Sequence, residues 1–293
     1  IVVPGGTTAY GLYFQYAYGN ASKNCVVANN VISAAGTTGA SYGIYCNNNA
    51  FQKIYNNSVV LTGGSATTAY AGLFLYTNNT YSNNEVRNNV FANLNGGRAA
   101  FFYAGATSAG TEFSHNNIYT TGTQLVVAHS STSSIPAGSI HSTIASWRAA
   151  TGQGKHCLSY RPPFLSNTDL RVDITDSAAW AMNGRGVHIP GNIADFDGNP
   201  RPEVRRQGAP DLGAFEFTPT SVPPRATADP AVPVTGVRQV FTLGGDTVAA
   251  ITWNSATPPS EVVVRQYSGA VPPALPGVDT MYFYVDLQAP GAP

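Results

Sequence analysis

The sequence of 293 residues carries 15 Lys and Arg against 15 Asp and Glu, a formal net charge of zero. Such a balance produces no long-range field toward nucleic acid or an anionic membrane surface, so we expect neither as a partner. No apolar run is long enough to predict membrane insertion. Charged residues make up only 10% of the chain, against roughly 25% in ordinary soluble domains. Asn, Ser, Thr, Gly and Tyr take their place, which favours β-structure with neutral polar faces.

A triplet of Gly, an aliphatic residue and an aromatic residue recurs in the first part of the chain. It begins at Gly11, Gly43 and Gly72, which are 32 and 29 residues apart, and AAFFY at 99–103 is a degenerate fourth copy. Strand alternation places Tyr13, Tyr45, Phe74 and Phe102 on the outer side, stacked coil upon coil as an aromatic ladder that could bind sugar rings. Two alternatives stay open: the ladder is covered by a loop or domain, or the faces are inverted. The same alternation places six side chains in the core: Leu12, Phe14, Ile44, Cys46, Leu73 and Leu75.

Pairs of Asn followed by aliphatic residues share the period of the triplets. The pairs begin at Asn29, Asn56, Asn88 and Asn116, at intervals of 27, 32 and 28 residues. Each unit contains short alternating strands and no helical pattern, and it cannot bury its apolar face alone. The repeat therefore predicts an all-β fold, a right-handed parallel β-helix (solenoid). Asn suits a recurring corner because it tolerates left-handed backbone and can hydrogen-bond to its copies.

A short capping helix is predicted at 143–154. Thr143 or Ser142 can cap its N-terminus, and Gly152 can end it. From the helix onward the chain contains Trp147 with a Gly a few residues on, Pro163–Phe164, Thr168–Asp169–Leu170, DFDGNPRP at 195–202 and APDLGAFEF at 209–217. This arrangement resembles the closing segment of secreted bacterial β-helix proteins of the pectin-lyase-like superfamily, in particular the choice-of-anchor type of surface protein. The resemblance covers about residues 1–217, and it implies fold more than function, because lyases, glycosidases and adhesins share it. The segment 152–160 departs from the pattern, since such proteins more often carry Asp and Ser there.

The C-terminal part divides into a linker and a second domain. Residues 218–234 are Pro-rich and predict a linker between a β-helix domain at 1–217 and a small antiparallel β-sandwich at 235–293. Four alternating strands are expected in the sandwich, in RQVFTL, TVAAITW, EVVVRQYSG and MYFYVDLQ. The segment VVVRQYSGAVPP resembles the small Ig-like modules that follow such β-helices in surface proteins. We therefore expect a partial Ig-like sandwich.

The visible coils offer little catalytic chemistry. Residues 1–110 contain five charged side chains: Lys23, Lys53, Glu85, Arg87 and Arg98. A glycosidase needs two carboxyl groups and a lyase needs a base with a cation beside the substrate carboxylate, so we assign no catalytic residue. Glu85 and Arg87 are two apart on one strand, which predicts an exposed ion pair.

Metal and disulfide sites are weakly indicated. DFDGN imitates the start of a calcium loop, but position twelve of an EF-hand would be Arg206 rather than Glu. A calcium site of another kind, formed by Asp195, Asp197 and Asp211, is one alternative. The other is that these carboxylates cap turns and pair with nearby Arg residues. Of three cysteines, Cys25 and Cys46 could form a disulfide, or all three could be buried thiols.

Two functional hypotheses follow. The first is a non-catalytic module of a secreted, extracellular or cell-surface protein, acting in adhesion, glycan contact or self-association into a fibre or larger assembly. The second is a fragment of a polysaccharide lyase or glycoside hydrolase with catalytic coils upstream of residue 1. The start at Ile1, without an initiator Met or signal peptide, favours a piece of a longer chain.

Overall fold

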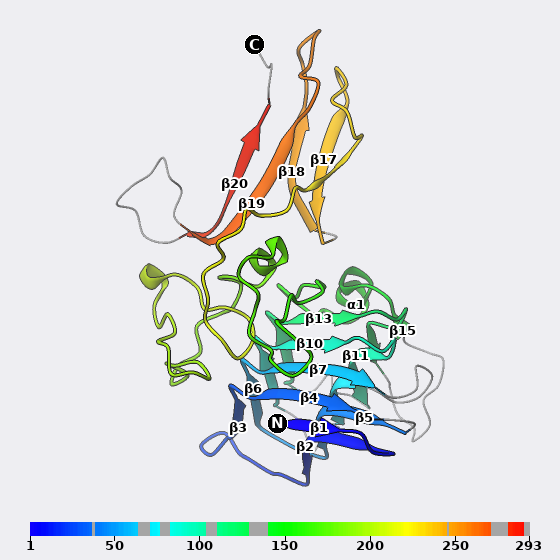
Figure 1. Cartoon of the computed structure of the whole chain (residues 1–293), viewed down its shortest axis with the longest axis vertical. Helices are drawn as coiled ribbons and strands as arrows, with labels where there is room; N and C mark the ends of the chain where they lie inside the picture. The colour runs from blue at the N-terminus through cyan, green and yellow to red at the C-terminus, as the bar shows by residue number, and fades with distance from the viewer. Residues whose placement is uncertain are drawn as a thin grey trace.

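The computed structural model describes all residues except 37–38, 64–70, 77–82, 104–109, 129–139, 245, 271–280 and 290–293; the side chains at 71, 76, 100–103, 127–128 and 281–282 are also outside the description. The predicted parallel β-solenoid is confirmed (Figure 1). Each coil gives one strand to each of three parallel sheets. No helix among the described residues is long and apolar enough to cross a membrane.

The strands follow each other in the same order in every coil. The first sheet contains β1 (Val2–Pro4), β4 (Val31–Ala35), β7 (Ser58–Gly63), β10 (Val90–Asn93) and β13 (Asn117–Thr120). The second contains β2 (Ala9–Gln15), β5 (Ser41–Asn47), β8 (Ala71–Tyr76), β11 (Arg98–Tyr103), β14 (Val126–Ala128) and the antiparallel β15 (Ile140–His141). The third contains β3 (Cys25–Ala28), β6 (Gln52–Tyr55), β9 (Glu85–Arg87) and β12 (Glu112–Ser114).

A two-residue corner joins the third sheet to the first in every coil. The first corner residue has a positive φ at Asn29 (56°), Asn56 (49°) and Asn88 (59°), and His115 (52°) takes this place in the next coil. The spacing of the Asn pairs predicts that Asn116 is the first residue of its corner, but in the structure His115 is the first residue and Asn116 is the second. Asn116 therefore aligns with the second corner residues. The expected corner is confirmed, and its last copy begins with His.

The second corner residues form a continuous hydrogen-bonded ladder. The backbone N–H of each one donates to the side-chain oxygen of the next, at 3.0, 2.9 and 2.9 Å, and the side-chain amides repeat this contact at 2.8, 2.8 and 2.9 Å. The ladder runs through Asn30, Asn57, Asn89 and Asn116. Its last backbone N–H lies 3.4 Å from the sulfur of Cys157. The ladder satisfies buried donors that would otherwise destabilise the corner.

The recurring Gly is explained by lack of space. A Cβ on Gly43 would lie 2.1 Å from Val59 Cγ1 and 2.5 Å from the carbonyl oxygen of Gly72. A Cβ on Gly11 would meet Ile32 Cγ2 at 2.3 Å. Both positions point into the core, directly before another core residue, so strand alternation is interrupted at each Gly.

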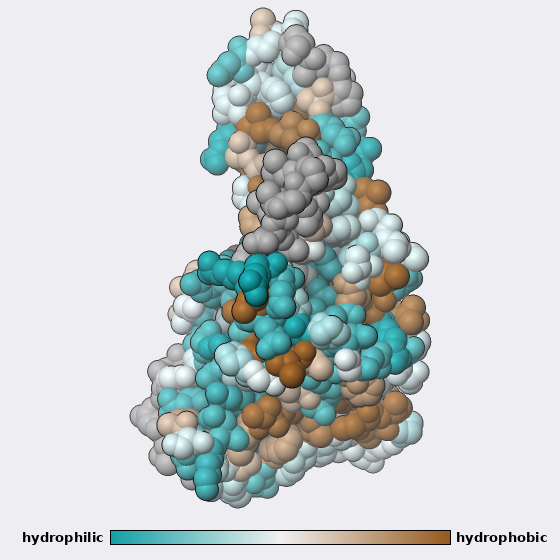
Figure 2. Space-filling model, turned by 90° about the vertical axis from the view of Figure 1, so that its left-hand side faces the viewer, coloured by the Kyte–Doolittle hydropathy of each residue, from teal (hydrophilic) through white to brown (hydrophobic). Residues whose placement is uncertain are grey.

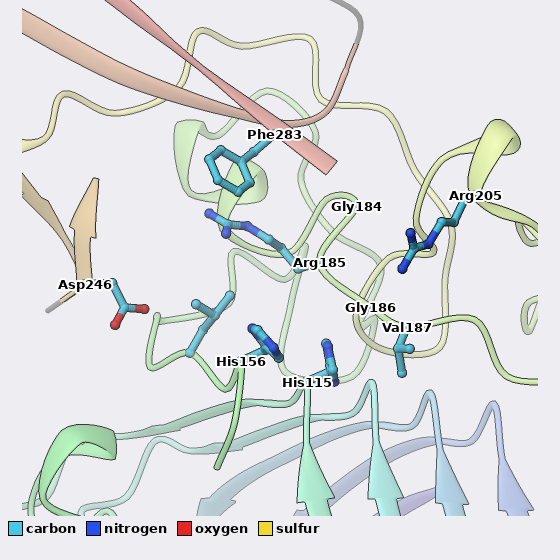
Figure 3. Close-up of a pocket in the computed structure, with 10 residues that line it drawn as sticks. His115, His156, Gly184, Arg185, Gly186, Val187, Arg205, Asp246 and Phe283 are labelled. Carbon is cyan, nitrogen blue, oxygen red and sulfur yellow. The ribbon is translucent and has the colours of Figure 1, made fainter. Parts of the chain in front are cut away.

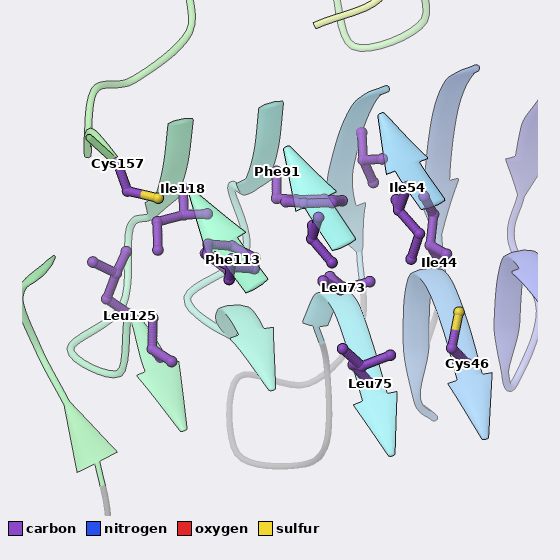
Figure 4. Packing of buried hydrophobic residues seen from close by; sticks show 14 of the residues in the cluster. Ile44, Cys46, Ile54, Leu73, Leu75, Phe91, Phe113, Ile118, Leu125 and Cys157 are labelled. Atoms are coloured by element: carbon purple, nitrogen blue, oxygen red, sulfur yellow. The ribbon is translucent and has the colours of Figure 1, made fainter. Parts of the chain in front are cut away.

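The core runs along the solenoid axis (Figure 4). Ile44, Cys46, Leu73 and Leu75 are fully buried, as expected from alternation, and Leu12 and Phe14 pack against them in a partly buried position. The predicted helix is also confirmed as α1 (Ile144–Thr151), capped by the Thr143 side chain and ended by Gly152 at φ 70°. Its buried Ile144 and Trp147 cover the end of the core, with the Trp147 ring edge-on to Phe113 at 5.0 Å.

The closing segment and the C-terminal sheets follow α1. The segment contains two 3₁₀ turns, η1 (Ser177–Ala181) and η2 (Arg205–Gln207), and folds back along the first sheet. The C-terminal part has one sheet of β16 (Thr227–Asp229), β17 (Arg238–Leu243) and β18 (Asp246–Thr252) and another of β19 (Val263–Ala270) and β20 (Met281–Gln288). All four expected antiparallel strands are present.

The segment expected as a linker makes contacts of its own. Strand β16 lies within 218–234 and pairs with β17. The indole N–H of Trp180 donates to the Ser221 carbonyl at 2.8 Å, and the Thr220 N–H donates to Ile174 at 2.9 Å. Figure 2 shows the C-terminal part as a narrower body on the broader solenoid, with hydrophobic and hydrophilic patches mixed over both.

Candidate functional site

An aromatic column crosses the second sheet. Register pairs Tyr13 with Tyr45 and Tyr45 with Phe74 in successive coils. The rings of Tyr13 and Tyr45 are 5.0 Å apart and 3° from parallel, and those of Tyr45 and Phe74 are 4.4 Å apart at 3°. The coil spacing and the parallel register therefore bring these three side chains into one stack.

A second aromatic column stands beside the first and was not predicted. Tyr10 and Tyr42 stack at 5.3 Å and 15°. Their rings meet the first column edge-on: Tyr10 lies 5.1 Å from Tyr13, and Tyr42 lies 5.5 Å from Phe74. Simple alternation would place a Tyr three positions before an outward residue on the inner side. Because Gly11 and Gly43 interrupt alternation, both tyrosines of each strand point outward. A Tyr before each Gly was the available signal.

We call these five residues, Tyr10, Tyr13, Tyr42, Tyr45 and Phe74, the aromatic face. Tyr13 is 49% exposed and Tyr10 38%, whereas Tyr42 is 7% exposed. Stacking covers ring faces, so the interior of the column presents mainly ring edges and hydroxyl groups. Tyr13 lies on the edge strand β2, at the end of the column. The open ring face of the column therefore lies at that end.

Burial favours the protonated form of two hydroxyl groups of the aromatic face, those of Tyr45 and Tyr10. Burial raises the pKa of Tyr45, with nearby Tyr10 and Tyr13 adding to the effect and a hydrogen bond from Asn47 opposing it. Burial also raises the pKa of Tyr10. The Tyr13 hydroxyl donates to Gln15 at 2.8 Å. These groups can donate and accept hydrogen bonds without introducing charge.

The register continues the first column at Phe101. Phe101 pairs with Phe74, and Phe102 pairs with the core residue Leu75. Counting from the degenerate segment AAFFY places Phe102 in the ladder, whereas the strand register puts Phe101 opposite Phe74. The repeat is instead Ala99–Ala100–Phe101, in which Ala99 takes the place of Gly. The side chains of Phe101 and Phe102 lie outside the described part.

A charged cluster lies on the third sheet. The expected ion pair is present but half-buried rather than exposed, with Arg87 Nη2 3.5 Å from Glu85 Oε2. The same nitrogen pairs with Glu112 of the next coil. The Tyr55 hydroxyl donates to Glu85. Sequence reasoning missed Glu112, although it follows Glu85 by 27 residues, one repeat length. The two carboxylates are thus neighbours in register.

The electrostatics of this cluster do not favour a general acid at Glu112. Burial acts to raise its pKa, but hydrogen bonds from Ser114 and Arg87 hold that pKa below its ordinary value. A glycosidase acid needs a raised pKa. Burial and the bond to Glu85 raise the pKa of Tyr55 well above its ordinary value, whereas a lyase base would need a lowered one.

The three candidate calcium ligands accept hydrogen bonds within the closing segment. Asp195 accepts from the backbone N–H groups of Asp197 and Asn199 at 2.9 and 2.8 Å. Asp211 accepts from those of Gly184 at 2.6 Å and Phe217 at 2.7 Å. The carboxylate oxygens of Asp195 and Asp211 that could bind a calcium ion therefore already accept hydrogen bonds from backbone N–H groups of these turns.

Arginine pairing completes this arrangement. Asp197 accepts from Arg171 at 2.9 and 3.1 Å, and the buried Arg201 pairs with Glu216. Burial raises the pKa of Glu216 to about 7, although Arg201 opposes the shift. Burial and Glu216 also raise the pKa of Asp211. Among described residues, no group of three or more His, Cys, Asp and Glu is arranged to hold a metal ion.

The cysteines are free thiols, so a Cys25–Cys46 disulfide is not formed. Cys46 and Cys157 are buried, and burial raises the pKa of each thiol to about 12. They stay protonated and act as small hydrophobic groups.

No protein-family model, curated protein or solved structure matches the chain.

Proposed function

We propose that the chain is a non-catalytic module of a secreted or cell-surface protein whose aromatic face contacts a neutral polysaccharide or cell-surface glycan. The observation that carries this proposal is the stack of Tyr13, Tyr45 and Phe74, flanked by Tyr10 and Tyr42. Strands β2, β5 and β8 contain no charged residue. An uncharged face suits an uncharged ligand.

The contact would combine two kinds of interaction. The Tyr13 ring can stack on the apolar face of a sugar at the end of the column. Farther along, Tyr hydroxyls and polar side chains such as Gln15 and Asn47, which are paired in register, can hydrogen-bond sugar hydroxyls. Parallel strands repeat these groups about every 4.8 Å, so an extended polymer can use several coils together.

The test is calorimetric titration with neutral oligosaccharides selected on a glycan array. Tyr13→Ala removes the ring at the end of the column and should weaken binding at least tenfold. Tyr45→Phe keeps the stack and removes one hydroxyl, so a smaller loss is expected. Tyr18→Ala, at a 55% exposed tyrosine outside the face, is the matched control. Equal binding by all three variants would refute the proposal, as would a complete absence of glycan binding.

A carbohydrate-cleaving activity is the second candidate, favoured by the adjacency of Glu85 and Glu112. Their register in neighbouring coils supplies the carboxyl pair that the sequence of the first coils lacked. Both carboxylates form ion pairs with Arg87, which favours a structural role for this cluster. Release of reducing ends or unsaturated sugars from polysaccharides, lost in Glu112→Gln but not in Tyr13→Ala, would support this candidate over the first.

Self-association is favoured by the edge strands β1, β2 and β3, which lack a partner on one side among the described residues. Val2 is 55% exposed and Val26 63%. Unpaired strand edges can template pairing with another chain. Sedimentation should show a concentration-dependent assembly that Val26→Lys reduces; a monomer at all concentrations would exclude it.

A further inference from the structure

A cavity of about 470 Å³ lies between the end of the solenoid and the C-terminal sheets (Figure 3). Its size is in the range of small-molecule sites, about 300–1,000 Å³. Its lining comes from a solenoid corner, the closing segment and both C-terminal sheets. The residues that matter here are His115, His156, Arg185, Arg205, Asp246 and Phe283.

Two histidines form one wall. The His115 and His156 rings stack at 4.7 Å and 30°. His115 stands at the corner position that earlier coils fill with Asn, so the fold itself does not call for an imidazole there. Because the Ser114 hydroxyl donates to Glu112, His115 Nδ1 donates to that hydroxyl at 3.1 Å, and the donor available to a ligand on this wall is the His156 ring.

Arg185 is the most deeply buried charged side chain among the described residues that line the cavity. Its guanidinium is largely buried, and burial lowers its pKa. With its amide oxygen oriented toward the guanidinium, Gln266 accepts from both terminal nitrogens at 3.1 Å. The Nε atom has no hydrogen-bond partner among the described residues, and none of their carboxylates pairs with Arg185. Burying a charge without an opposite charge is unfavourable, so a ligand that brings a negative charge would stabilise this group.

The loop that carries Arg185 is held firmly. The N–H of Gly184 donates to Asp211 at 2.6 Å, and that of Gly186 donates to Pro210 at 2.8 Å. The next N–H, of Val187, donates to the side chain of Asn88 at 2.9 Å. The guanidinium is therefore presented by a backbone fixed on both sides.

The remaining described lining residues carry a net positive charge and provide one apolar wall. Arg205 lies on the opposite side from Asp246 (Figure 3). Asp246, the carboxylate among the lining residues, lies 4.0 Å from Arg148, which is outside the lining. Two guanidinium groups thus face one partly compensated carboxylate. Phe283 supplies an apolar surface beside the charges.

We propose that this cavity binds a small oxyanion, a carboxylate or sulfate carried on a molecule of about monosaccharide size. Arg185 contacts the anion, Arg205 adds a second positive charge, and His156 supplies a ring N–H donor. Phe283 packs against the uncharged part of the ligand. Guanidinium groups bind planar and tetrahedral oxyanions through paired hydrogen bonds. This site is independent of the aromatic face.

The experiment titrates the full chain by calorimetry with glucuronate, with glucose 6-sulfate and with glucose, in a low-salt buffer without phosphate or sulfate. Glucuronate, glucose 6-sulfate or both should bind, and glucose should not; the two anionic arms distinguish a carboxylate ligand from a sulfate ligand. Failure of both anions, or equal binding of glucose, would overturn the proposal.

Three variants locate the site. Arg185→Gln should reduce affinity at least tenfold, and Arg205→Gln by threefold or more. Arg206→Gln, an exposed neighbour that does not line the cavity, should bind like the parent chain. If Arg185→Gln does not fold, as judged by circular dichroism, Arg205→Gln decides the question. Unchanged binding in Arg205→Gln, or an equal loss in Arg206→Gln, would place the anion elsewhere and refute the assignment.

Discussion

The side-chain oxygen of Asn89 accepts two hydrogen bonds from Asn57 of the preceding coil, from its backbone N–H at 2.9 Å and its side-chain amide at 2.8 Å. Both residues are fully buried. One side chain therefore satisfies two donors that no water reaches, and it ties neighbouring coils together at their corner.

Asn89→Ala is expected to destabilise the solenoid strongly. It leaves the Asn57 backbone N–H and one amide hydrogen of its side chain buried without a partner, while the other amide hydrogen still reaches the Val27 carbonyl. At about 1–3 kcal/mol for each lost partner, a total of about 3 kcal/mol is expected. Asn30→Ala is the control, because Asn30 lies at the ladder's end and its backbone N–H still reaches Asn57. Its cost should stay below about 1 kcal/mol. Urea unfolding measures both, and equal losses would contradict the ladder's role.

Gly43→Ala should lower the stability of the protein more than Gly72→Ala. The added Cβ at Gly43 meets Val59 at 2.1 Å, whereas at Gly72 the nearest atoms are 2.9 Å away. Overpacking typically costs about 1–3 kcal/mol, and we expect Gly43→Ala at the upper end and Gly72→Ala at the lower. Thermal unfolding of the two variants checks the order. A reversed order would show that the core relaxes in a way that the packing does not suggest.

His115→Asn should make the protein less sensitive to acid. Burial, followed by His156 and Arg87, lowers the pKa of His115 to about 4. The unfolded chain therefore binds this proton more readily between pH 6.5 and 4, and stability falls as pH decreases through that window. Asn, used at this corner by three earlier coils, removes the effect, which we place at about 1–2 kcal/mol after allowing for solvent screening. Urea unfolding at pH 7 and 4.5 measures it. A His115 ring that titrates near pH 6.5 by NMR would contradict the explanation.

Glu216→Gln should change the pH dependence in the opposite sense. Because the folded pKa of Glu216 is raised to about 7, the native state holds its proton more tightly than the unfolded chain. Stability contributed by this group is present below pH 4.5 and decreases as pH rises toward 7, by about 2 kcal/mol. The variant should flatten this decrease, measured by urea unfolding at pH 5 and 7.5. Glu203→Gln, at an exposed residue of the same segment, should leave it unchanged. A similar slope in the Glu216 variant would contradict the assignment.

The sequence predicted the solenoid because two markers shared one period. It also predicted the bounds of β17 and β20, where alternation is uninterrupted. It did not predict the outward position of Tyr10 and Tyr42, since the steric need for Gly at 11 and 43 depends on Ile32 and Val59 in other strands. The orientation of these two tyrosines therefore depends on packing between strands that are distant in the sequence.

Register explains the other differences. Phe101 rather than Phe102 follows Phe74, because the fourth copy replaces Gly with Ala99 and the local motif no longer marks the phase. His115 replaces the first corner Asn, so counting Asn pairs places the last corner one residue late. The cavity between solenoid and C-terminal sheets joins segments that no local pattern connects.

The three corners of a coil differ in how they accommodate added residues. Two residues separate the third-sheet strand from the next first-sheet strand in every coil: 29–30, 56–57, 88–89 and 115–116. Between the first and second sheets the separation is five residues after β4, seven after β7 and four after β10. Evolutionary insertions and engineered loops should therefore be accepted between these latter strands and rejected at the two-residue corner. A peptide tag placed after β7 would keep the coil spacing intact, whereas one placed between Asn56 and Asn57 would unfold it.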